Sequence, residues 1–325
     1  MRLVTFEIGN ESRVGSWIDN DQLIVDLTSA GKKHSNAEDF ASMRSLIDAG
    51  PVAWDRAREM TEQRGDGALI ETDAVRLRAP LPRPAQIRDF VCFEEHLVNS
   101  LNAALNVLSA ETEDPVARRA ELVASGMWSM PQVWYKKPFY YTGNRFAISG
   151  PNDDICWPPY SNLIDFELEF AAVIGKSGVN IRKEEALSHV FGFTIMNDWS
   201  ARDEQGIVME GKLGPGKAKD FDQGTTLGPC IVTLDDIVDP YDLRMTARVN
   251  GDVWCSNSSS TMGHRFEDVI AELSSGLTIH PGEVIGSGTV GGGCGIEQMR
   301  FLKIGDVVEL EVERIGTLRN QIARP

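Results

Sequence analysis

The chain has 325 residues, of which 42% are hydrophobic and 25% charged, a composition typical of a globular protein rather than a disordered one. Its 48 Asp and Glu residues outnumber 32 Lys and Arg residues, which gives a formal net charge of −16. Because so acidic a chain repels phosphate backbones and anionic lipids, neither nucleic acid nor a membrane is an expected partner, and an anionic substrate needs a local basic cluster.

The sequence also lacks signals for membrane insertion or secretion. No apolar run reaches the roughly 18 residues of a membrane span. The start, "MRLVTFEIGN", has neither the apolar core nor the small-residue cleavage site of a secretory signal. The five cysteines are scattered and never form a CxxC pair, which predicts reduced thiols in a cytoplasmic protein rather than disulfides or a zinc site.

The first part of the chain predicts a small N-terminal domain. Short alternating runs before residue 30 indicate strands, and residues 38–64 indicate two helices divided at Gly50. The proline-rich stretch "RAPLPRPAQ" (78–86) is a stiff connector and the best candidate for a boundary. We therefore expect an N-terminal α/β domain at 1–80 and a metal-dependent catalytic domain at 81–325.

The second part predicts a mainly β domain with a helical insertion. Residues 94–126 have a helical pattern, and the insertion at about 98–130 is expected to form a lid that shapes specificity. After it come short strands and Gly-rich turns, interrupted by two predicted helices, "RKEEALSHVFGF" (182–193) and "RFEDVIAELSSG" (265–276). Strands without a regular βαβ rhythm favour a mixed or antiparallel β architecture.

One strand-like stretch, "LIDFELEFAAVIG" (163–175), places Asp165, Glu167 and Glu169 on one face, each about 6.6–7 Å from the next. A solvated face is the ordinary explanation for such a pattern. The run continues into residues that are apolar on both faces, however, so the carboxylates adjoin a core. With Asp198 after another apolar run, they suggest a hard divalent cation held by oxygen ligands.

Two further stretches carry possible catalytic donors. In "NDWSARDEQ", Asp198, Arg202 and Gln205 have the spacing of one helical face, and Arg202 and Gln205 suit a carboxylate or enolate oxygen; helix capping is the alternative. In "GPGKAKDFDQG", Lys219 can stabilise an oxyanion beside a metal, or it is simply solvated. His96 is one of five histidines, any of which is a natural proton shuttle.

The order of these motifs resembles the fumarylacetoacetate hydrolase superfamily. "DFELEFAAVIGK", "HVFGFTIMNDWSARDEQ", "KAKDFDQGTTLGP", "GEVIGSGTVGGG" and "FLKIGDVVELEVERIGTLRN" recur in sequence over roughly residues 85–321. The resemblance implies an α+β, mainly β fold, a mixed β-sandwich roll, with a bound Mg²⁺, Mn²⁺ or Ca²⁺. It also implies a small anionic diketo or oxo acid as substrate, aromatic catabolism as the setting, and a homodimer.

The resemblance assigns residues to roles. Asp165 is expected to hydrogen-bond to the backbone or to support the ligands. The implied metal ligands are Glu167, Glu169 and Asp198; the implied catalytic residues are His96, Lys219, Gln205 and Arg202; and the implied substrate-binding residues are Lys137, Thr289 and Tyr135.

The chain departs from the family pattern near His96. Many small members have HxxE there, whereas this chain has Asn99, and Phe93 replaces a common Tyr. A carboxylate partner for His96 must come from elsewhere, with Glu94, Glu95 and Glu297 as candidates.

The resemblance predicts a hydrolase that cleaves a C–C bond in a fumarylacetoacetate- or acylpyruvate-like acid. The alternatives are a decarboxylase, hydratase or tautomerase of a 2-oxo acid, because all of these reactions use a stabilised enolate. A non-catalytic protein in which Ca²⁺ links strands is the remaining possibility.

Overall fold

The computed structural model describes residues 1–33, 37–64, 69–110, 112–126 and 129–324. Its strands are β1 (Arg2–Ile8), β2 (Glu11–Ile18), β3 (Leu23–Asp26), β4 (Leu69–Glu71), β5 (Arg76–Arg78), β6 (Gln86–Phe90), β7 (Tyr140–Gly143), β8 (Ile148–Ser149), β9 (Asp154–Cys156), β10 (Ile164–Asp165), β11 (Leu168–Ile174), β12 (Val190–Asp198), β13 (Ser200–Ala201), β14 (Thr225–Thr233), β15 (Arg244–Val249), β16 (Asp252–Ser258), β17 (Glu283–Gly286), β18 (Val307–Val312) and β19 (Gly316–Ala323). Its α-helices are α1 (Leu27–Gly31), α2 (Met43–Ala49), α3 (Pro51–Glu62), α4 (Glu94–Ala110), α5 (Pro115–Ala124), α6 (Arg202–Val208) and α7 (Phe266–Ser274).

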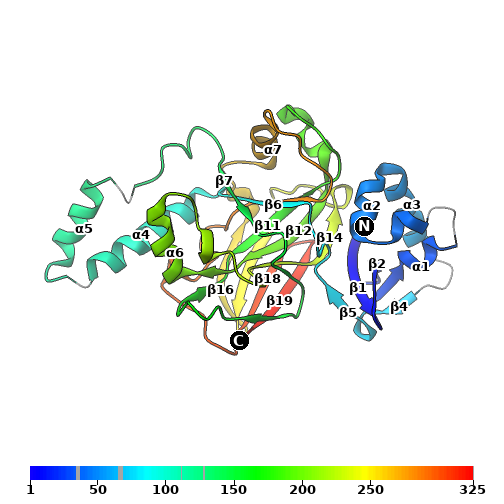
Figure 1. Ribbon diagram of the computed structural model, residues 1–325, viewed down its shortest axis with the longest axis horizontal. Helices are drawn as coiled ribbons and strands as arrows, with labels where there is room; N and C mark the ends of the chain where they lie inside the picture. The colour runs from blue at the N-terminus through cyan, green and yellow to red at the C-terminus, as the bar shows by residue number, and fades with distance from the viewer. Residues whose placement is uncertain (34–36, 65–68, 111, 127–128, 325) are drawn as a thin grey trace.

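Two β-sheets form the body of the molecule (Figure 1). The large sheet has the strand order β4-β3-β2-β1-β14-β12-β11-β17-β6-β7, and a smaller one has the order β16-β15-β18-β19-β9. A continuous apolar core joins them, with Phe170 and Phe193 from the large sheet and Leu310 and Leu318 from the small one. This arrangement confirms the predicted α+β, mainly β class with mixed sheets.

Side chains of strand β11 and of the two residues before it alternate between two faces, as the sequence predicts. Phe166, Leu168 and Phe170 lie in the core that joins the sheets. Glu167 and Glu169 point the other way, and both are buried. Side chains on this second face therefore have to find partners inside the protein rather than in water.

The N-terminal segment forms a lobe at one side of the body (Figure 1). Its strand β1 pairs antiparallel with β14, with Leu3 opposite Ile231, so the large sheet runs through both parts of the chain. Helix α2 ends at Ala49 and α3 begins at Pro51, which confirms the predicted break at Gly50. The domain boundary near residue 80 remains a prediction. Main-chain hydrogen bonds between β1 and β14 join the segments before and after it.

The predicted helix at 182–193 is wrong over its last four residues. A short 3₁₀ helix covers Lys183–His189, and β12 follows directly. Residues 190–193 are buried between β11 and β14, and their sequence, VFGF, has no polar position that would indicate the period of a strand. The helix predicted at 265–276 is confirmed as α7.

The insertion after His96 is helical, as predicted. It consists of α4 and α5, with Asp114 capping the start of α5 through Val116 and Ala117. The two helices project from the body (Figure 1). Residues 111, 127 and 128 of this insertion lie outside the described residues. Among the described residues, no helix has the length and hydropathy of a membrane span.

Candidate active site

Four buried carboxylates meet on interior strands of the large sheet. Asp89, Glu167, Glu169 and Asp198 each offer an oxygen, and these four oxygens lie within 4.8 Å of one another. They come from β6, the start of β11 and the end of β12. Sequence analysis predicted three of them as a set; Asp89 was missed.

A glycine allows Asp89 to reach Glu169 across an intervening strand. Gly286 of β17 lies between them, opposite Asp89 on one side and Ala171 on the other. A Cβ atom at this position would lie 2.4 Å from Asp89 Oδ1 and 3.1 Å from Glu169 Oε2. The Gly288 backbone N–H contacts both carboxylates, at 3.2 Å each. The absence of a side chain at Gly286 therefore allows the carboxylates of Asp89 and Glu169 to approach each other.

The surroundings drive the pKa values of these carboxylates apart. Burial, followed by the charge of Asp198, raises the pKa of Asp89 to about 8. Burial and the charge of Asp89 raise the pKa of Glu169 well above its usual range, and burial also raises the pKa of Asp198. Burial would raise the pKa of Glu167 too, but the charges of Lys219 and Arg202 outweigh it and hold that pKa below its ordinary value.

Lys219 supplies positive charge directly to the cluster. Its ammonium donates to Glu167 Oε2 at 2.8 Å, to Asp198 Oδ2, and to Ser200 Oγ at 2.8 Å. The Tyr141 hydroxyl donates to the same Asp198 oxygen at 2.6 Å. Burial would lower the pKa of Lys219, but the charges of Asp198 and Glu167 outweigh it and raise that pKa, so the ammonium stays charged.

Arg202 ties the cluster to Asp165. Its Nε donates to Asp165 Oδ2 and its second terminal nitrogen contacts Glu167 Oε1, both at 2.8 Å. Asp165 also accepts from the backbone N–H groups of Gly295 and Ile296. The backbone contacts confirm the first of the two roles predicted for Asp165, hydrogen bonding to backbone, and its support of metal ligands remains a prediction.

The cluster fits a divalent cation. Glu169 Oε1 and Asp198 Oδ1 are buried, and neither has a hydrogen-bond partner in the described part of the chain. Among the described residues, Lys219 and Arg202 are the cations that form ion pairs with these four carboxylates and Asp165. An all-oxygen donor set with uncompensated negative charge suits Mg²⁺, Mn²⁺ or Ca²⁺, and does not suit a soft metal.

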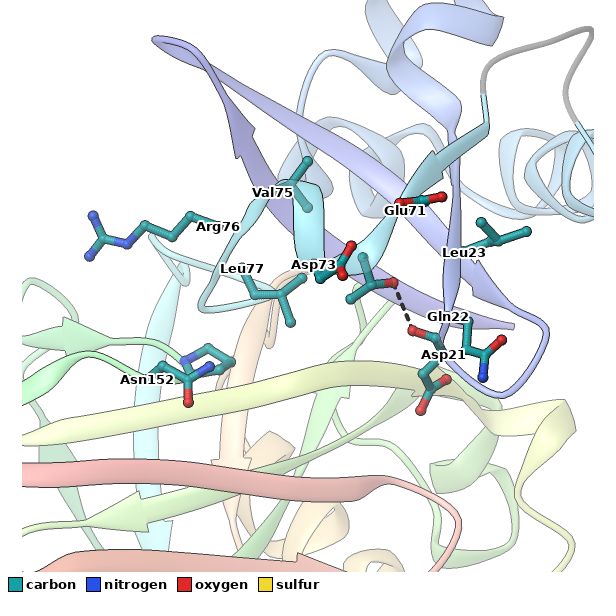
Figure 2. Close-up of a pocket in the computed structure, with 11 residues that line it drawn as sticks. Asp21, Gln22, Leu23, Glu71, Asp73, Val75, Arg76, Leu77 and Asn152 are labelled. Atoms are coloured by element: carbon teal, nitrogen blue, oxygen red, sulfur yellow. Dashed lines mark hydrogen bonds between the residues drawn. The ribbon is translucent and has the colours of Figure 1, made fainter.

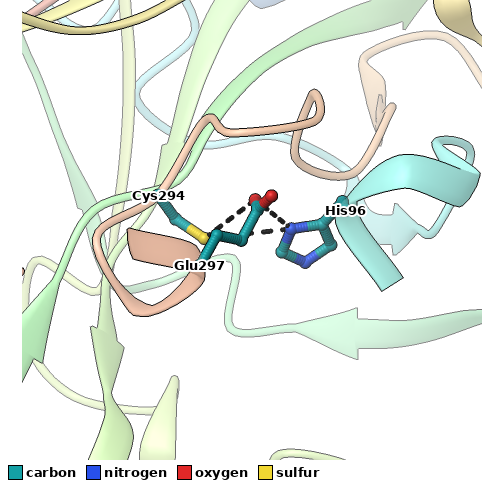
Figure 3. A group of neighbouring side chains, drawn as sticks. All are labelled: His96, Cys294 and Glu297. Atoms are coloured by element: carbon teal, nitrogen blue, oxygen red, sulfur yellow. Dashed lines mark hydrogen bonds and ion pairs between the residues drawn. The ribbon is translucent and has the colours of Figure 1, made fainter. Parts of the chain in front are cut away.

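His96 is held by a carboxylate from a distant segment (Figure 3). Its Nδ1 lies 2.7 Å from Glu297 Oε1, and the other oxygen of Glu297 accepts from Asn99 Nδ2 at 2.8 Å and from the Gly292 N–H at 2.7 Å. The Cys294 thiol donates to Glu297 Oε1 at 3.2 Å. Because the Glu297 carboxylate accepts from every neighbour, it orients the imidazole with a proton on Nδ1.

This histidine–glutamate pair adjoins the carboxylate cluster. Glu167 forms a backbone bridge with Cys294, whose thiol contacts Glu297. A charge on His96 contributes to the lowered pKa of Glu167. Of the three candidate partners for His96, the structure places Glu297 against it, whereas Glu94 bonds to Tyr135 and Glu95 bonds to Asn257.

The remaining predicted residues divide into two groups. Thr289 is 2% exposed and its hydroxyl has no partner within the described residues, so it is available to a ligand. Gln205 Oε1 accepts from Arg202 at 2.8 Å. Tyr135 and Lys137 lie outside these contacts, since Tyr135 is 54% exposed and the Lys137 ammonium pairs with Glu272 of α7.

Asp198 is not on a helix with Arg202 and Gln205, contrary to the predicted spacing argument. It ends β12, and α6 begins only at Arg202 after the short strand β13. Asp89 could have been found from the sequence as a lone acidic residue in the apolar run "QIRDFVCF", shortly before His96.

A separate hollow of about 950 Å³ lies beside the N-terminal strands (Figure 2). Asp21, Glu71, Asp73 and Arg76 line it together with Asn152, and the Thr72 hydroxyl donates to the Asp21 carbonyl at 2.7 Å. None of the predicted site residues lines this hollow. This hollow is therefore separate from the carboxylate cluster.

Comparison with known proteins agrees with this geometry. Residues 109–323 match the family described as fumarylacetoacetate hydrolase C-terminal. The chain is 31% identical over 334 residues to oxaloacetate tautomerase YisK of Bacillus subtilis, a match that covers 99% of this chain and 100% of the relative. It is 41% identical over 191 residues to the human mitochondrial oxaloacetate tautomerase FAHD2A, covering 58% and 59% of the two chains.

Solved structures share the fold. A fumarylacetoacetate hydrolase from Exiguobacterium antarcticum superposes with a TM-score of 0.74 at 26% identity, covering 100% of both chains. A maleylpyruvate hydrolase from Sphingobium sp. SYK-6, in complex with manganese(II) and pyruvate, has a TM-score of 0.71 at 22% identity, covering 100% of this chain and 99% of the other.

Proposed function

Because the chain belongs to the fumarylacetoacetate hydrolase family, whose members bind a divalent metal and act on small organic acids, we propose that it is a metal-dependent tautomerase of a 2-oxo acid such as oxaloacetate. One observation carries the proposal: a buried cation-binding cluster with Lys219 adjoins the His96–Glu297 pair. Tautomerisation needs both capabilities, stabilisation of an enolate oxygen and transfer of one proton. Two similar proteins named oxaloacetate tautomerases support the substrate class.

The cluster side of the site handles the substrate's charge. A divalent ion held by Asp89, Glu167, Glu169 and Asp198 would supply positive charge to the substrate's carboxylate and keto oxygens. Lys219 donates to the oxygen on which negative charge develops, because its ammonium already lies among these carboxylates in a site shielded from water.

Arg202 keeps this side of the site in shape. Its guanidinium donates to Asp165 and Gln205 and forms an ion pair with Glu167. Gln205 accepts through its oxygen, so its amide nitrogen remains available as a donor to the substrate. Thr289 offers a second uncharged donor from the Gly-rich loop.

The histidine side of the site moves the proton. With Nδ1 engaged by Glu297, the other ring nitrogen of His96 is the one that takes the proton from the enol oxygen and delivers it to the substrate carbon, or carries it the opposite way in the reverse reaction. Glu297 stabilises the imidazolium formed in between, as a buried carboxylate does beside a catalytic histidine. Asn99 keeps Glu297 in place.

Hydrolysis of a C–C bond is the second candidate, favoured by the same His96–Glu297 contact. A histidine paired with a carboxylate can activate water instead of abstracting a carbon-bound proton. The two activities make different demands, because hydrolysis also needs room for a water molecule beside the substrate carbonyl. A tautomerase needs the same enolate stabilisation and the proton carrier, but no room for a water molecule.

The experiment follows the enol form of oxaloacetate by its ultraviolet absorbance, with Mg²⁺ or Mn²⁺ and after treatment with EDTA. Acylpyruvate and fumarylacetoacetate are assayed in parallel. We expect fast metal-dependent loss of the enol, a large decrease in Lys219→Met, and wild-type rates in Lys217→Met, whose exposed ammonium donates to the Asp220 carbonyl and lies over the Tyr160 ring. Cleavage of acylpyruvate without tautomerase activity would assign the second candidate, and no metal-dependent turnover of any of these acids would refute both.

A further inference from the structure

Next to the oxygen cluster lies a chemically different group of side chains, His96, Cys294 and Glu297 (Figure 3). It offers a nitrogen, a sulfur and an oxygen, whereas the carboxylate cluster offers oxygen alone. Imidazole and thiolate ligands select zinc, whereas carboxylates suit Mg²⁺ and Mn²⁺. The two groups are therefore expected to prefer different metals.

The spacing of the three ligand atoms is close to that of a zinc site. His96 Nδ1 lies 2.7 Å from Glu297 Oε1 and 3.8 Å from Cys294 Sγ, and Sγ lies 3.2 Å from the same Oε1. In a tetrahedral site with ordinary zinc bond lengths, such atoms lie about 3.3–3.6 Å apart. Each pair is thus within about 0.6 Å of the required separation, a change that side-chain rotation can supply.

Charge and access also fit. Zn²⁺ bound to one thiolate and one carboxylate forms a neutral complex, which is the form that a buried site favours. Cys294 is fully buried, and 14% of the His96 side chain is exposed, so an ion would enter past the imidazole. Water completes the fourth position of a three-ligand site.

We propose that His96, Cys294 and Glu297 form a second metal site, selective for Zn²⁺, that switches the enzyme off. Binding breaks the hydrogen bond between His96 Nδ1 and Glu297 and moves the Nδ1 proton, by way of solvent, to the other ring nitrogen, so that the neutral imidazole can bind through Nδ1. Zn–N, Zn–S and Zn–O bonds form, and the thiol proton is released to solvent. The imidazole then has no carboxylate to stabilise its charged form. The inhibitory part rests on the proposed function, in which His96 is the proton carrier; the binding part does not.

The absence of a CxxC pair explains why the sequence favoured no zinc site. The three ligands come from α4, from a loop and from the 3₁₀ helix η9 (Ile296–Gln298), so no short motif records them. Only the fold brings His96 to Cys294 and Glu297.

The test uses the full protein with saturating Mg²⁺, so that the oxygen cluster is filled, and adds ZnCl₂. Calorimetry measures zinc affinity, and X-ray absorption at the zinc edge identifies the ligands. We expect one zinc with a sulfur neighbour at about 2.3 Å and an imidazole nitrogen at about 2.0 Å. Cys294→Ser should remove the sulfur and weaken binding at least tenfold, while Cys156→Ser, which alters an exposed cysteine, should bind zinc as wild type does.

His96→Ala gives an independent check should Cys294→Ser fail to fold, and it should remove the nitrogen neighbour. A zinc spectrum with oxygen neighbours only, or unchanged affinity in a folded Cys294→Ser or His96→Ala protein, would overturn the site. Zinc should also stop turnover at a stoichiometry of one per chain, and excess Mg²⁺ should not relieve it. Sulfur-ligated zinc in a protein without tautomerase activity would refute the proposed function but support the zinc site. An active tautomerase without sulfur-ligated zinc would support the proposed function but refute the zinc site.

Discussion

Replacing Glu297 by Gln tests the acid–base pair directly. The Glu297 side chain is fully buried, and its two oxygens accept from His96, Asn99, Gly292 and Cys294. An amide has one accepting oxygen and one donating nitrogen, so at least one of these donors would face another donor. If the amide nitrogen faces His96, the ring must present its other tautomer, and the nitrogen that should accept the substrate's proton becomes protonated.

The expected magnitude follows from this geometry. Losing a correctly oriented general base lowers rates by about 10²–10⁴, which corresponds to about 3–5 kcal/mol of transition-state stabilisation. The buried donor left without an acceptor lowers the free energy of unfolding by about 1–3 kcal/mol. Divalent-metal affinity should stay near the wild-type value, because Glu297 is not in the carboxylate cluster.

The assay is steady-state turnover of enol oxaloacetate with Mg²⁺, compared with Mg²⁺ titration by calorimetry. Glu95→Gln is the matched control, because this glutamate lies on α4 one residue before His96 but bonds to Asn257 instead. A folded Glu297→Gln protein within threefold of wild-type kcat would refute the role of the pair. A loss of metal binding equal to the loss of rate would show that Glu297 acts through the cluster.

Other measurements test the cluster and the assembly. Gly286→Ala should weaken Mg²⁺ binding by about 10–100-fold, because the new methyl group displaces Asp89 and disturbing the groups around metal ligands usually costs this much. Gly211→Ala, which has open space around it, should bind Mg²⁺ as wild type does. Equal Mg²⁺ affinities of Gly286→Ala and wild type in calorimetry would contradict this prediction. In EDTA, the free energy of unfolding should fall as the pH rises from 3.8 to about 8, because folded Asp89 retains a proton that the unfolded chain has released. Asp89 contributes a slope of at most about 1.4 kcal/mol per pH unit to the free energy of unfolding, and Mg²⁺ should reduce this slope. If urea titrations without metal gave a free energy of unfolding that does not change with pH, a buried protonated carboxyl would be excluded. We also expect a homodimer, the commonest assembly of soluble oligomers, and light scattering that gave a monomer at micromolar concentration would argue against it.

The sequence was sufficient for the residues that lie on one regular strand. The alternation at Glu167 and Glu169 predicted a shared face, and the apolar continuation of the strand predicted that the face is buried; both features are present. Asp165 belongs to the same alternation but pairs with Arg202, because the chain leaves the sheet between β10 and β11. The periodicity of the sequence does not predict a break of this kind between two strands.

Contacts between distant segments could not be derived from the pattern alone. Asp89 joins the cluster only because Gly286 lies between its strand and β11, and that neighbour relation is set by sheet order. Glu297 was one of several candidates for His96, and the choice depended on where the 3₁₀ helix η9 packs against α4. The helix predicted over 182–193 was wrong at 190–193, because the first four residues of the buried strand β12 are all apolar or glycine and indicate no period.

The two halves of the site also differ in how firmly the fold holds them. The carboxylates lie on or beside neighbouring strands in the middle of the large sheet, whereas His96 lies near the start of α4, whose far end projects from the body. Amide protons of β11 and β12 should therefore exchange with solvent only through global unfolding, while those of α4 exchange through smaller, local openings. In mild denaturant, the protein is then expected to pass through a range in which it still binds its divalent ion but no longer transfers a proton. Loss of activity would precede loss of metal, and hydrogen exchange would identify α4 as the element that opens first.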